Sequence, residues 1–256
     1  MTDLLIIQVI AAIIYASLWY LAAQRLRRYD VADIAWGLGF IYLMIIARLS
    51  GNNLSLRGLW VQLFVTLWGL RLSLYIFFRN RGKPEDPRYR KWRNEWGTHA
   101  AIRAFLQLFL FQGILMVIIL IPATYVLEYG GPDLKWLDVA GAAVFLCGFV
   151  AETVADFQKY RFKSNPLNRG RFISAGLWKY SRHPNYFGEV TFWWGIWLTA
   201  CSVSGGWLTI WGPITITCLI LFVSGIPLLE KRYEGNREYE AYKRRTSAFF
   251  PLPTKR

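Results

Sequence analysis

The sequence has few of the residues that build metal centres and disulfide frameworks. Its 256 residues include only three cysteines, Cys147, Cys201 and Cys218, and two histidines, His99 and His183. The cysteines lie in apolar segments without CxxC spacing, so we interpret them as small buried apolar residues. The scarcity of histidine argues against a histidine-rich metal centre. No metal site is therefore predicted.

Acidic residues and glycine-rich loops are scarce as well. There are 16 Asp and Glu against 30 Lys and Arg, which gives a formal net charge of +14. No GxGxxG segment follows a strand-like run, so a Rossmann domain is excluded and any nucleotide must be held by another kind of site. The charge has two interpretations: cytoplasmic retention of basic loops with attraction to anionic lipids, or binding of a polyanionic ligand. The membrane is a predicted partner, and no nucleic-acid partner is expected.

Apolar residues, by contrast, are abundant. They make up 55% of the chain, and aromatic residues make up 17%. This exceeds the apolar content of an ordinary soluble domain, and seven windows are long and apolar enough to span a bilayer core. The sequence therefore predicts one all-α domain over residues 1–256, a polytopic membrane protein with seven transmembrane helices. The windows are about residues 4–23, 32–49, 59–78, 104–127, 137–155, 185–202 and 207–229.

Basic residues are concentrated in alternate loops. The segments that hold nearly all Lys and Arg are residues 24–31, 79–103, 156–184 and the tail from 230. By the positive-inside rule, the N-terminus is predicted outside and the C-terminus in the cytoplasm. The first window lacks a basic n-region and a cleavage site, so it is interpreted as a mature helix. The expected location is the inner membrane of a bacterium.

The sixth window places polar groups on one face of an apolar helix. Pro184 can occupy the first helical turn, and Asn185, Glu189 and Trp193 follow at steps of four residues. An amide and a carboxylate one turn apart can satisfy the donor and acceptor of a carboxamide. The tryptophan offers a flat wall, and nicotinamide combines a carboxamide with a flat ring. The alternative is that Asn185 caps the helix while Glu189 pairs with a nearby arginine.

The fifth window carries a similar stripe. Glu152, Asp156, Lys159 and Lys163 run at helical spacing from membrane depth toward the cytoplasmic loop. A carboxylate at the interface can accept ribose hydroxyls, and lysines further out can meet phosphates. The alternative is a ladder of surface salt bridges, which we prefer for Lys159. For Asp156 we favour a functional role, because a carboxylate near the bilayer core needs a partner.

Four blocks carry a family resemblance that covers nearly the whole chain. The blocks are residues Asp33–Phe40, Trp68–Leu72, Arg79–Asp86 and Gly176–Glu189. With them the chain resembles the bacterial DUF1295 proteins, a branch of the steroid 5-alpha-reductase-like membrane oxidoreductases. The short Arg182–Pro184 piece alone is less specific, because isoprenylcysteine carboxyl methyltransferases share it.

The resemblance implies a seven-helix fold that holds NADPH in a cavity open to the cytoplasm. It assigns Asn185 and Glu189 to the nicotinamide end, and Trp193 to the wall of the cofactor site. Asp156 takes the acidic position of the fifth helix, and the phosphate contacts fall on basic residues. The remaining predicted cofactor-binding residues are Lys83, Lys163, Arg171, Arg182, His183, Arg232 and Tyr233.

The catalytic positions match the family less well. Animal steroid reductases polarise the substrate ketone with a Glu and a Tyr from early helices. Here Asp33 stands for the Glu, and no Tyr occupies the equivalent position. Arg71 and Tyr75 of the third window are candidates; their alternatives are a snorkelling cation and an interfacial aromatic residue.

The implied reaction saturates a C=C bond conjugated to a carbonyl. The substrate would be apolar, a 3-oxo-Δ4-steroid or another lipid, and would enter from the bilayer. A protein acid such as Asp33 would hydrogen-bond the carbonyl oxygen, where charge develops. One rival function is a methyltransferase that uses S-adenosylmethionine, for which Lys163 and Arg171 would have no phosphate to bind. The other is a lipid-binding or scaffold protein without enzymatic activity.

Overall fold

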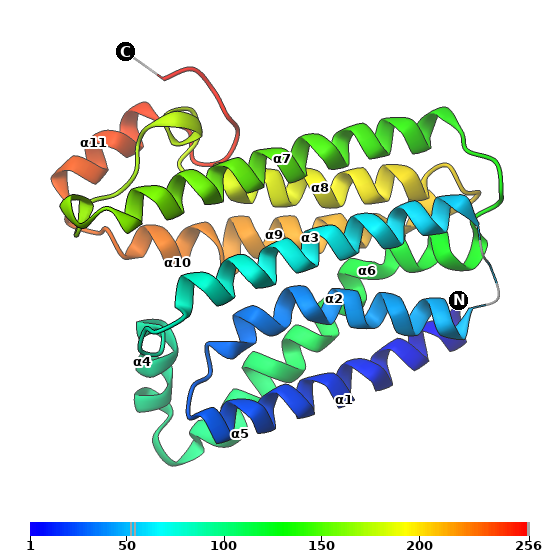
Figure 1. Cartoon of the computed structure of the whole chain (residues 1–256), viewed down its shortest axis with the longest axis horizontal. Helices are drawn as coiled ribbons and strands as arrows, with labels where there is room; N and C mark the ends of the chain where they lie inside the picture. The colour runs from blue at the N-terminus through cyan, green and yellow to red at the C-terminus, as the bar shows by residue number, and fades with distance from the viewer. Residues whose placement is uncertain (52, 54, 255–256) are drawn as a thin grey trace. The chain divides into compact units, whose positions relative to one another are not determined.

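The computed structural model describes residues 1–51, 53 and 55–254 and is helical throughout its regular elements (Figure 1). Within these ranges there is no β-strand, only an isolated bridge between Ser181 and Ser247. The helices are α1 (Thr2–Leu26), α2 (Val31–Ser50), α3 (Leu56–Asn80), α4 (Pro87–Trp96), α5 (Ala100–Arg103), α6 (Phe111–Tyr129), α7 (Trp136–Ser164), α8 (Pro184–Ala200), α9 (Trp211–Cys218), α10 (Ile226–Lys231) and α11 (Arg237–Arg245). The all-α prediction is confirmed for this part of the chain.

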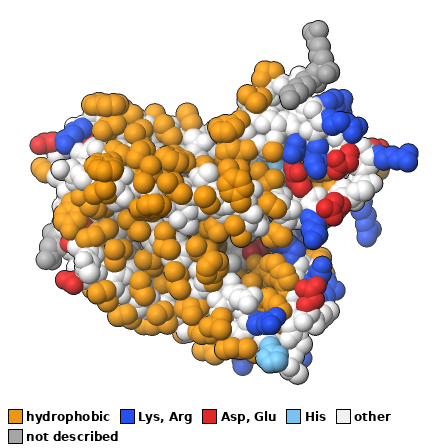
Figure 2. All heavy atoms as spheres, turned by 180° about the vertical axis from the view of Figure 1, so that it is seen from behind, with side chains coloured by type: hydrophobic (Ala, Val, Ile, Leu, Met, Phe, Trp, Pro, Cys, Tyr) orange, Lys and Arg blue, Asp and Glu red, His pale blue; other side chains and the backbone are white. Residues whose placement is uncertain are grey.

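Large apolar side chains face outward along the long helices. On α1, Ile6, Ile10, Ile14 and Leu18 are exposed on one stripe. Hydrophobic side chains cover most of the surface visible in Figure 2. In water such a surface would be unfavourable, whereas lipid solvates it. Among the described residues, six helical segments are long and apolar enough to cross a membrane: 2–26, 31–50, 56–80, 87–129, 136–164 and 206–231.

Three details differ from the sequence-based expectation. The helix at the sixth window, α8, has 17 residues and is not among these six segments. The expected basic loop 79–103 contains a helix, α4. The expectation that all cysteines are buried is wrong, since Cys147 and Cys218 are exposed. A thiol on the outer face of an apolar helix can contact lipid without the cost of exposing apolar surface to water.

The chain divides into two compact units. Unit 1 comprises residues 1–135 and 199–212. Within it α2 and α3 touch backbone to backbone, because a Cβ on Gly37 would lie 2.5 Å from the carbonyl oxygen of Gly69. A buried polar contact also joins its helices. Gln8 donates to the carbonyl of Leu43 at 3.3 Å, and Thr124 donates to the Gln8 side chain at 3.1 Å. Such pairs are typical of helices packed in lipid.

Unit 2 comprises residues 136–198 and 213–256, described here to residue 254. Its helices α7 and α8 are antiparallel and also approach backbone to backbone. A Cβ on Gly148 would lie 2.5 Å from the Phe192 nitrogen, and one on Gly188 would lie 2.5 Å from the Glu152 nitrogen. Small residues at such crossings permit this close approach. The polar stripes of the two helices are thereby brought close together.

Candidate functional site

The predicted stripes of α7 and α8 meet at Asp156 and Asn185. The side-chain nitrogen of Asn185 donates to Oδ1 of Asp156 at 3.2 Å. Asp156 is only 4% exposed. The side-chain oxygen of Asn185 is buried and accepts no hydrogen bond from the described residues. A buried acceptor of this kind is unfavourable unless a donor reaches it.

Glu189 and Trp193 continue the stripe along α8. Both are buried, with Trp193 only 1% exposed. On α7 the buried Glu152, one turn before Asp156, packs against Gly188 of α8. The alternative in which Asn185 caps α8 would need its side-chain oxygen to accept a backbone N–H of the helix, and that oxygen accepts no hydrogen bond from the described residues. The helix therefore presents an amide, a carboxylate and an aromatic wall on successive turns.

Arg182 and His183 are tied to the last helical segments of unit 2. The Arg182 Nε donates to Glu230 at 2.7 Å, and its Nη1 donates to the carbonyls of Lys243 and Thr246 at 3.0 and 2.7 Å. The His183 Nε2 lies 3.1 Å from the same Glu230 oxygen. Both side chains thus hold the chain segment before α8 in place. Their predicted contact with a cofactor stays a prediction.

Burial sets the charge of His183. Desolvation lowers its pKa, and this outweighs the hydrogen bond and the charge of Glu230, which raise it. In the neutral ring the proton belongs on Nε2, because a carboxylate can only accept. Nδ1 is then a buried acceptor that contacts no donor among the described residues.

Basic residues gather at the C-terminal end of α7. The Lys163 ammonium donates to the carbonyl of Arg171 at 2.5 Å. The Arg232 guanidinium is near enough to repel the Lys163 charge, and the Tyr233 ring packs edge-on against Phe172 at 6.0 Å. No ion pair of Lys163 or Arg232 with a carboxylate occurs among the residues described. The structure thus brings together four of the predicted residues.

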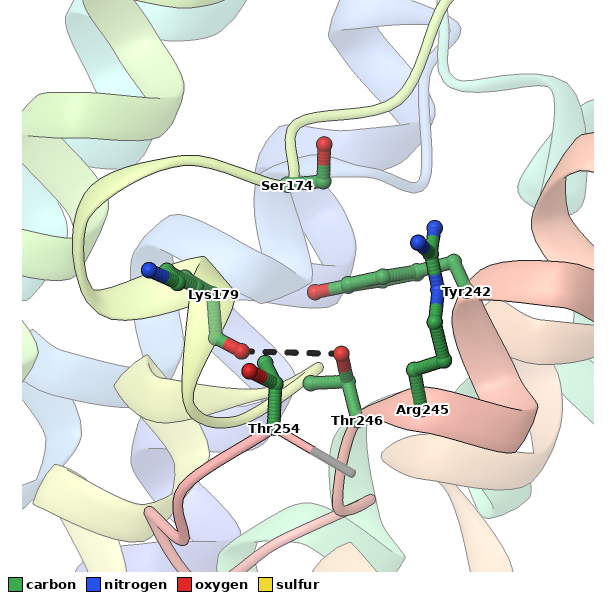
Figure 3. A pocket seen from close by; sticks show the side chains of 6 residues that line it. All are labelled: Ser174, Lys179, Tyr242, Arg245, Thr246 and Thr254. Atoms are coloured by element: carbon green, nitrogen blue, oxygen red, sulfur yellow. Dashed lines mark hydrogen bonds between the residues drawn. The ribbon is translucent and has the colours of Figure 1, made fainter. Parts of the chain in front are cut away.

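Two cavities open in the same unit. A pocket of about 260 Å³ lies between the loop before α8 and the C-terminal segment (Figure 3). A wider groove of about 600 Å³ adjoins the end of α7. The groove is lined by Gln158, Arg161, Phe162, Ser164, Asn165, Asn168, Ile173, Ala175 and Gly176. None of the predicted cofactor-binding residues lines either cavity, although Lys163 has groove residues on both sides in sequence.

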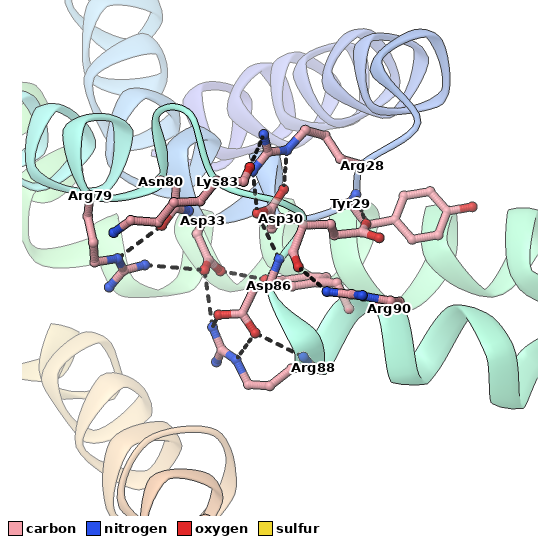
Figure 4. A network of polar contacts seen from close by, with 12 residues as sticks. Arg28, Tyr29, Asp30, Asp33, Arg79, Asn80, Lys83, Asp86, Arg88 and Arg90 are labelled. Atoms are coloured by element: carbon pink, nitrogen blue, oxygen red, sulfur yellow. Dashed lines mark hydrogen bonds and ion pairs between the residues drawn. The ribbon is translucent and has the colours of Figure 1, made fainter. Parts of the chain in front are cut away.

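In unit 1, Asp33 is the centre of a polar network (Figure 4). Its Oδ1 accepts from the Tyr89 hydroxyl at 2.5 Å, and its Oδ2 accepts from Arg88 at 3.2 Å. Arg79 lies 3.9 Å from the same oxygen. Asp33 therefore has a tyrosine partner, but one from α4 rather than from α3.

Sequence reasoning missed Tyr89 and Arg88 because a basic, polar segment between apolar windows predicts a loop. The available signal was Asp86–Pro87: Asp86 caps α4 by accepting from the Arg88 nitrogen at 2.9 Å, and Pro87 occupies the first turn. A helix that begins there turns Tyr89 toward the buried core cluster of unit 1.

Arg71 and Tyr75 lie on one face of α3. Arg79, one turn beyond Tyr75, places its guanidinium 5.6 Å from the centre of the Tyr75 ring. Arg79 thus connects Tyr75 with Asp33. Arg71 lies one turn before Tyr75, on the same face.

Lys83 belongs to unit 1, unlike the other predicted cofactor residues. Its side chain is exposed, and its carbonyl accepts from Arg28 at 3.4 Å. Arg28 in turn makes two 2.7 Å hydrogen bonds to Asp30, which also accepts from the Asp86 nitrogen at 3.1 Å. These contacts anchor the loop that carries Lys83 (Figure 4).

No group of three or more His, Cys, Asp or Glu able to hold a metal ion occurs in the part of the chain that the structure describes. The long apolar helices, with charged and amide side chains between them, define a multi-pass, all-helical membrane protein. The sequence profile described as "Protein of unknown function (DUF1295)" matches residues 19–246. The chain therefore belongs to the DUF1295 family.

Two curated proteins are similar to the chain. An uncharacterised protein of Schizosaccharomyces pombe is 26% identical over 255 residues, which cover 88% of this chain and 71% of that protein. A protein of Ustilaginoidea virens named "Probable O-methyltransferase ustE" is 33% identical over 66 residues, 26% of this chain and 22% of that protein. No solved structure matches the chain.

Proposed function

We propose that this protein is an NADPH-dependent membrane reductase that saturates a C=C bond conjugated to a carbonyl in an apolar substrate. The observation that carries the proposal is the Asp156–Asn185 hydrogen bond, which leaves the Asn185 oxygen buried and open to a donor. Family membership supports it through the resemblance to steroid 5-alpha-reductase-like proteins.

The residues of α7 and α8 fit the nicotinamide end of the cofactor. A carboxamide offers two N–H donors and one acceptor. The Asn185 oxygen would accept from it, Glu189 would accept one turn deeper, and Trp193 would bound the ring. Asp156 would keep the Asn185 amide in the orientation that leaves its oxygen open.

The end of α7 fits the phosphates. Lys163 and Arg232 are like charges near each other, an arrangement that a polyanion stabilises. Lys163 follows Asp156 by seven residues, two helical turns or about 10 Å. The chain thus places a buried seat of hydrogen-bonding groups and a cationic end along one helix, which matches a ligand with a carboxamide-bearing ring and charged phosphates.

Asp33, Tyr89 and Arg88 are the candidates for polarising the substrate carbonyl. NADPH, when bound, would supply the hydride. The Tyr89 hydroxyl donates its single proton to Asp33 and so positions that carboxyl group, and the Arg88 guanidinium, which has further N–H groups, is a donor held in place by Asp33. Preorganised donors of this kind stabilise charge that develops on an oxygen.

The proposal includes the membrane arrangement. With α8 counted as a seventh span, the N-terminus is outside and the C-terminus is in the cytoplasm, as the basic loops predict. The basic end of α7 then faces the cytoplasmic nucleotide, and the apolar substrate enters from the lipid. The proposed location is a bacterial inner membrane.

Nucleotide binding by the purified protein in detergent tests the proposal. Energy transfer from the 13 tryptophans to the reduced nicotinamide reports binding directly. We expect NADPH to bind more tightly than NADH, and Glu189→Gln to weaken NADPH binding. Glu234→Gln, at an exposed position, is the matched control. Equal and weak binding of both nucleotides would refute the cofactor assignment.

A methyltransferase is the second candidate. The similarity to a protein named as an O-methyltransferase favours it, together with the Arg182–Pro184 piece. S-adenosylmethionine carries no phosphate, so its binding would be insensitive to Lys163→Gln. Transfer of a labelled methyl group from S-adenosylmethionine, without NADPH binding, would establish this function in place of the reductase.

A further inference from the structure

None of the residues assigned above to the nucleotide lines the pocket in Figure 3. Its volume is about 260 Å³, and it is lined by Ser174, Lys179, Tyr242, Arg245, Thr246 and Thr254. Besides the Tyr242 phenol, three of these side chains bear a hydroxyl and two bear a positive charge. None is a carboxylate. The pocket therefore has the composition of an anion site.

The walls of the pocket are fixed by hydrogen bonds to the backbone. The Tyr242 hydroxyl donates to the carbonyl of Trp178, and burial raises the pKa of Tyr242, so the hydroxyl keeps its proton. Thr246 donates to the carbonyl of Lys179 at 3.5 Å. The Leu252 nitrogen donates to the carbonyl of Tyr180 at 3.0 Å, which joins the C-terminal segment to the opposite wall. These hydrogen bonds fix the backbone around the pocket, which lowers the cost of ordering it when a ligand binds.

The charge in the pocket comes from two cations that have no ion pair with a carboxylate among the described residues. In Figure 3 Lys179 lies beyond the hydroxyl end of Tyr242, with its side chain directed away from the phenol, and Arg245 crosses the other end of Tyr242 in this view. The Lys179 ammonium lies 5.8 Å from the centre of the exposed Tyr180 ring. This is a weak contact that a bound anion can replace. Arg245 ends α11, where its side chain is exposed.

The carbonyl groups at the end of α11 would repel an anion if they were free. Arg182 removes that obstacle, because its Nη1 donates to the carbonyls of Lys243 and Thr246. The guanidinium of Arg182 is itself neutralised by Glu230 at 2.7 Å. The positive field of Lys179 and Arg245 is therefore opposed by few acceptors.

We infer that this pocket binds a phosphate group, held by Lys179 and Arg245 and by the hydroxyls of Ser174 and Thr254. A phosphate offers several strong acceptor oxygens to donors from different directions, and arginine is well suited to it. The Tyr242 and Thr246 hydroxyls already donate elsewhere, so they shape the pocket. The phosphate comes from a phospholipid headgroup or from a soluble phosphate compound, and it is distinct from the phosphates of the nucleotide.

Equilibrium dialysis with radioactive inorganic phosphate tests this assignment on the full chain, purified in detergent and freed of phospholipid. We expect saturable binding at one site, weakened about tenfold by Arg245→Gln, the effect of losing one charge-assisted hydrogen bond. Arg244→Gln removes a neighbouring exposed charge that does not line the pocket, and should leave binding unchanged. Lys179→Gln combined with Arg245→Gln should abolish binding while thermal unfolding shows that the protein is folded.

Competition identifies the source of the phosphate. Unlabelled inorganic phosphate and short-chain phosphatidic acid are compared as competitors of the radioactive phosphate. If phosphatidic acid competes at lower concentration than phosphate does, the natural ligand is a lipid headgroup. If it competes only at higher concentration, the natural ligand is a soluble phosphate compound. NADPH should not compete, and its affinity should be the same in Arg245→Gln. Absence of saturable binding, equal effects of Arg245→Gln and Arg244→Gln, or competition by NADPH would each overturn the inference. The first two results would leave the reductase proposal untouched.

Discussion

Asn185 on α8 donates its side-chain hydrogen bond to Asp156 on α7, 29 residues earlier in the chain, at 3.2 Å. The contact depends on the close approach of the two helices at Gly148 and Gly188. It orients the Asn185 oxygen and leaves it buried without a donor among the described residues. A structural feature of the helix pair thus prepares the group that we propose binds the carboxamide.

The first prediction concerns the carboxylate of this pair. Asp156→Asn keeps the size of the side chain and an acceptor oxygen, but it removes the negative charge. We expect NADPH binding to weaken about tenfold, because a charged hydrogen bond to Asn185 becomes a neutral one. The affinity is measured by energy transfer from tryptophan. Asp133→Asn, at an exposed position of unit 1, should have no effect; an unchanged affinity in Asp156→Asn would contradict the proposed seat.

A second prediction separates the two candidate tyrosines. Tyr89→Phe removes the hydroxyl that donates to Asp33 and changes little else. We expect the rate of enone reduction to fall by roughly 10² or more, because Asp33 loses the hydrogen bond that positions it for general acid catalysis, with NADPH affinity unchanged. Tyr75→Phe is the comparison, since the Tyr75 ring lies 5.6 Å from the guanidinium of Arg79, which belongs to the same network. A larger loss of reduction rate in Tyr75→Phe than in Tyr89→Phe would assign the catalytic role to Tyr75 instead.

The helix crossing itself can be tested by a third substitution. Gly188→Ala would place a Cβ 2.5 Å from the Glu152 nitrogen and 2.6 Å from the Gly148 carbonyl oxygen. Backbone atoms cannot yield as a flexible side chain can, so we expect a loss of about 1–3 kcal/mol in the free energy of unfolding. Thermal unfolding in detergent measures the change. Gly131→Ala is the control, because a methyl group added there would have no atom within 4 Å; equal stability of the two variants would show that the helices are further apart.

The fourth prediction is a pH dependence of stability. The folded pKa of His183 is lowered by burial, whereas the unfolded chain takes up the proton at about pH 6.5. The unfolded state therefore binds more protons as the pH falls below that value, and the free energy of unfolding decreases until the folded form is protonated too. Glu230, Arg182 and Lys159 are the charges acting on the ring.

The measurement is thermal unfolding between about pH 5 and pH 8, a range that brackets the ordinary histidine titration. In His183→Gln the unfolding temperature should fall less at the acidic end of this range than in the unsubstituted protein. His99→Gln, which changes the other histidine at an exposed position, should keep it. A decline of the same size in His183→Gln would assign it to other groups.

Local pattern predicted most of the helices and the polar stripes. Six of the seven hydrophobic windows fall on helical segments long enough to cross a membrane, because backbone groups in lipid must be satisfied within the helix. Asn185, Glu189 and Trp193 were placed on one face by spacing alone, and Glu189 and Trp193 on that face are buried. Helix α4 was missed because its sequence is strongly basic and polar, and the hydropathy windows do not detect such a helix.

The amino-acid sequence by itself determined which segments are helical and apolar and which residues share a helix face, because these follow from the period of one helix. Only the tertiary structure decided the partners: Tyr89 with Asp33, Asn185 with Asp156, and His183 with Glu230. These pairs lie 29 to 56 residues apart. The periodicity of one helix does not say which turn of another helix it packs against. That pairing depends on where small residues let the two backbones touch.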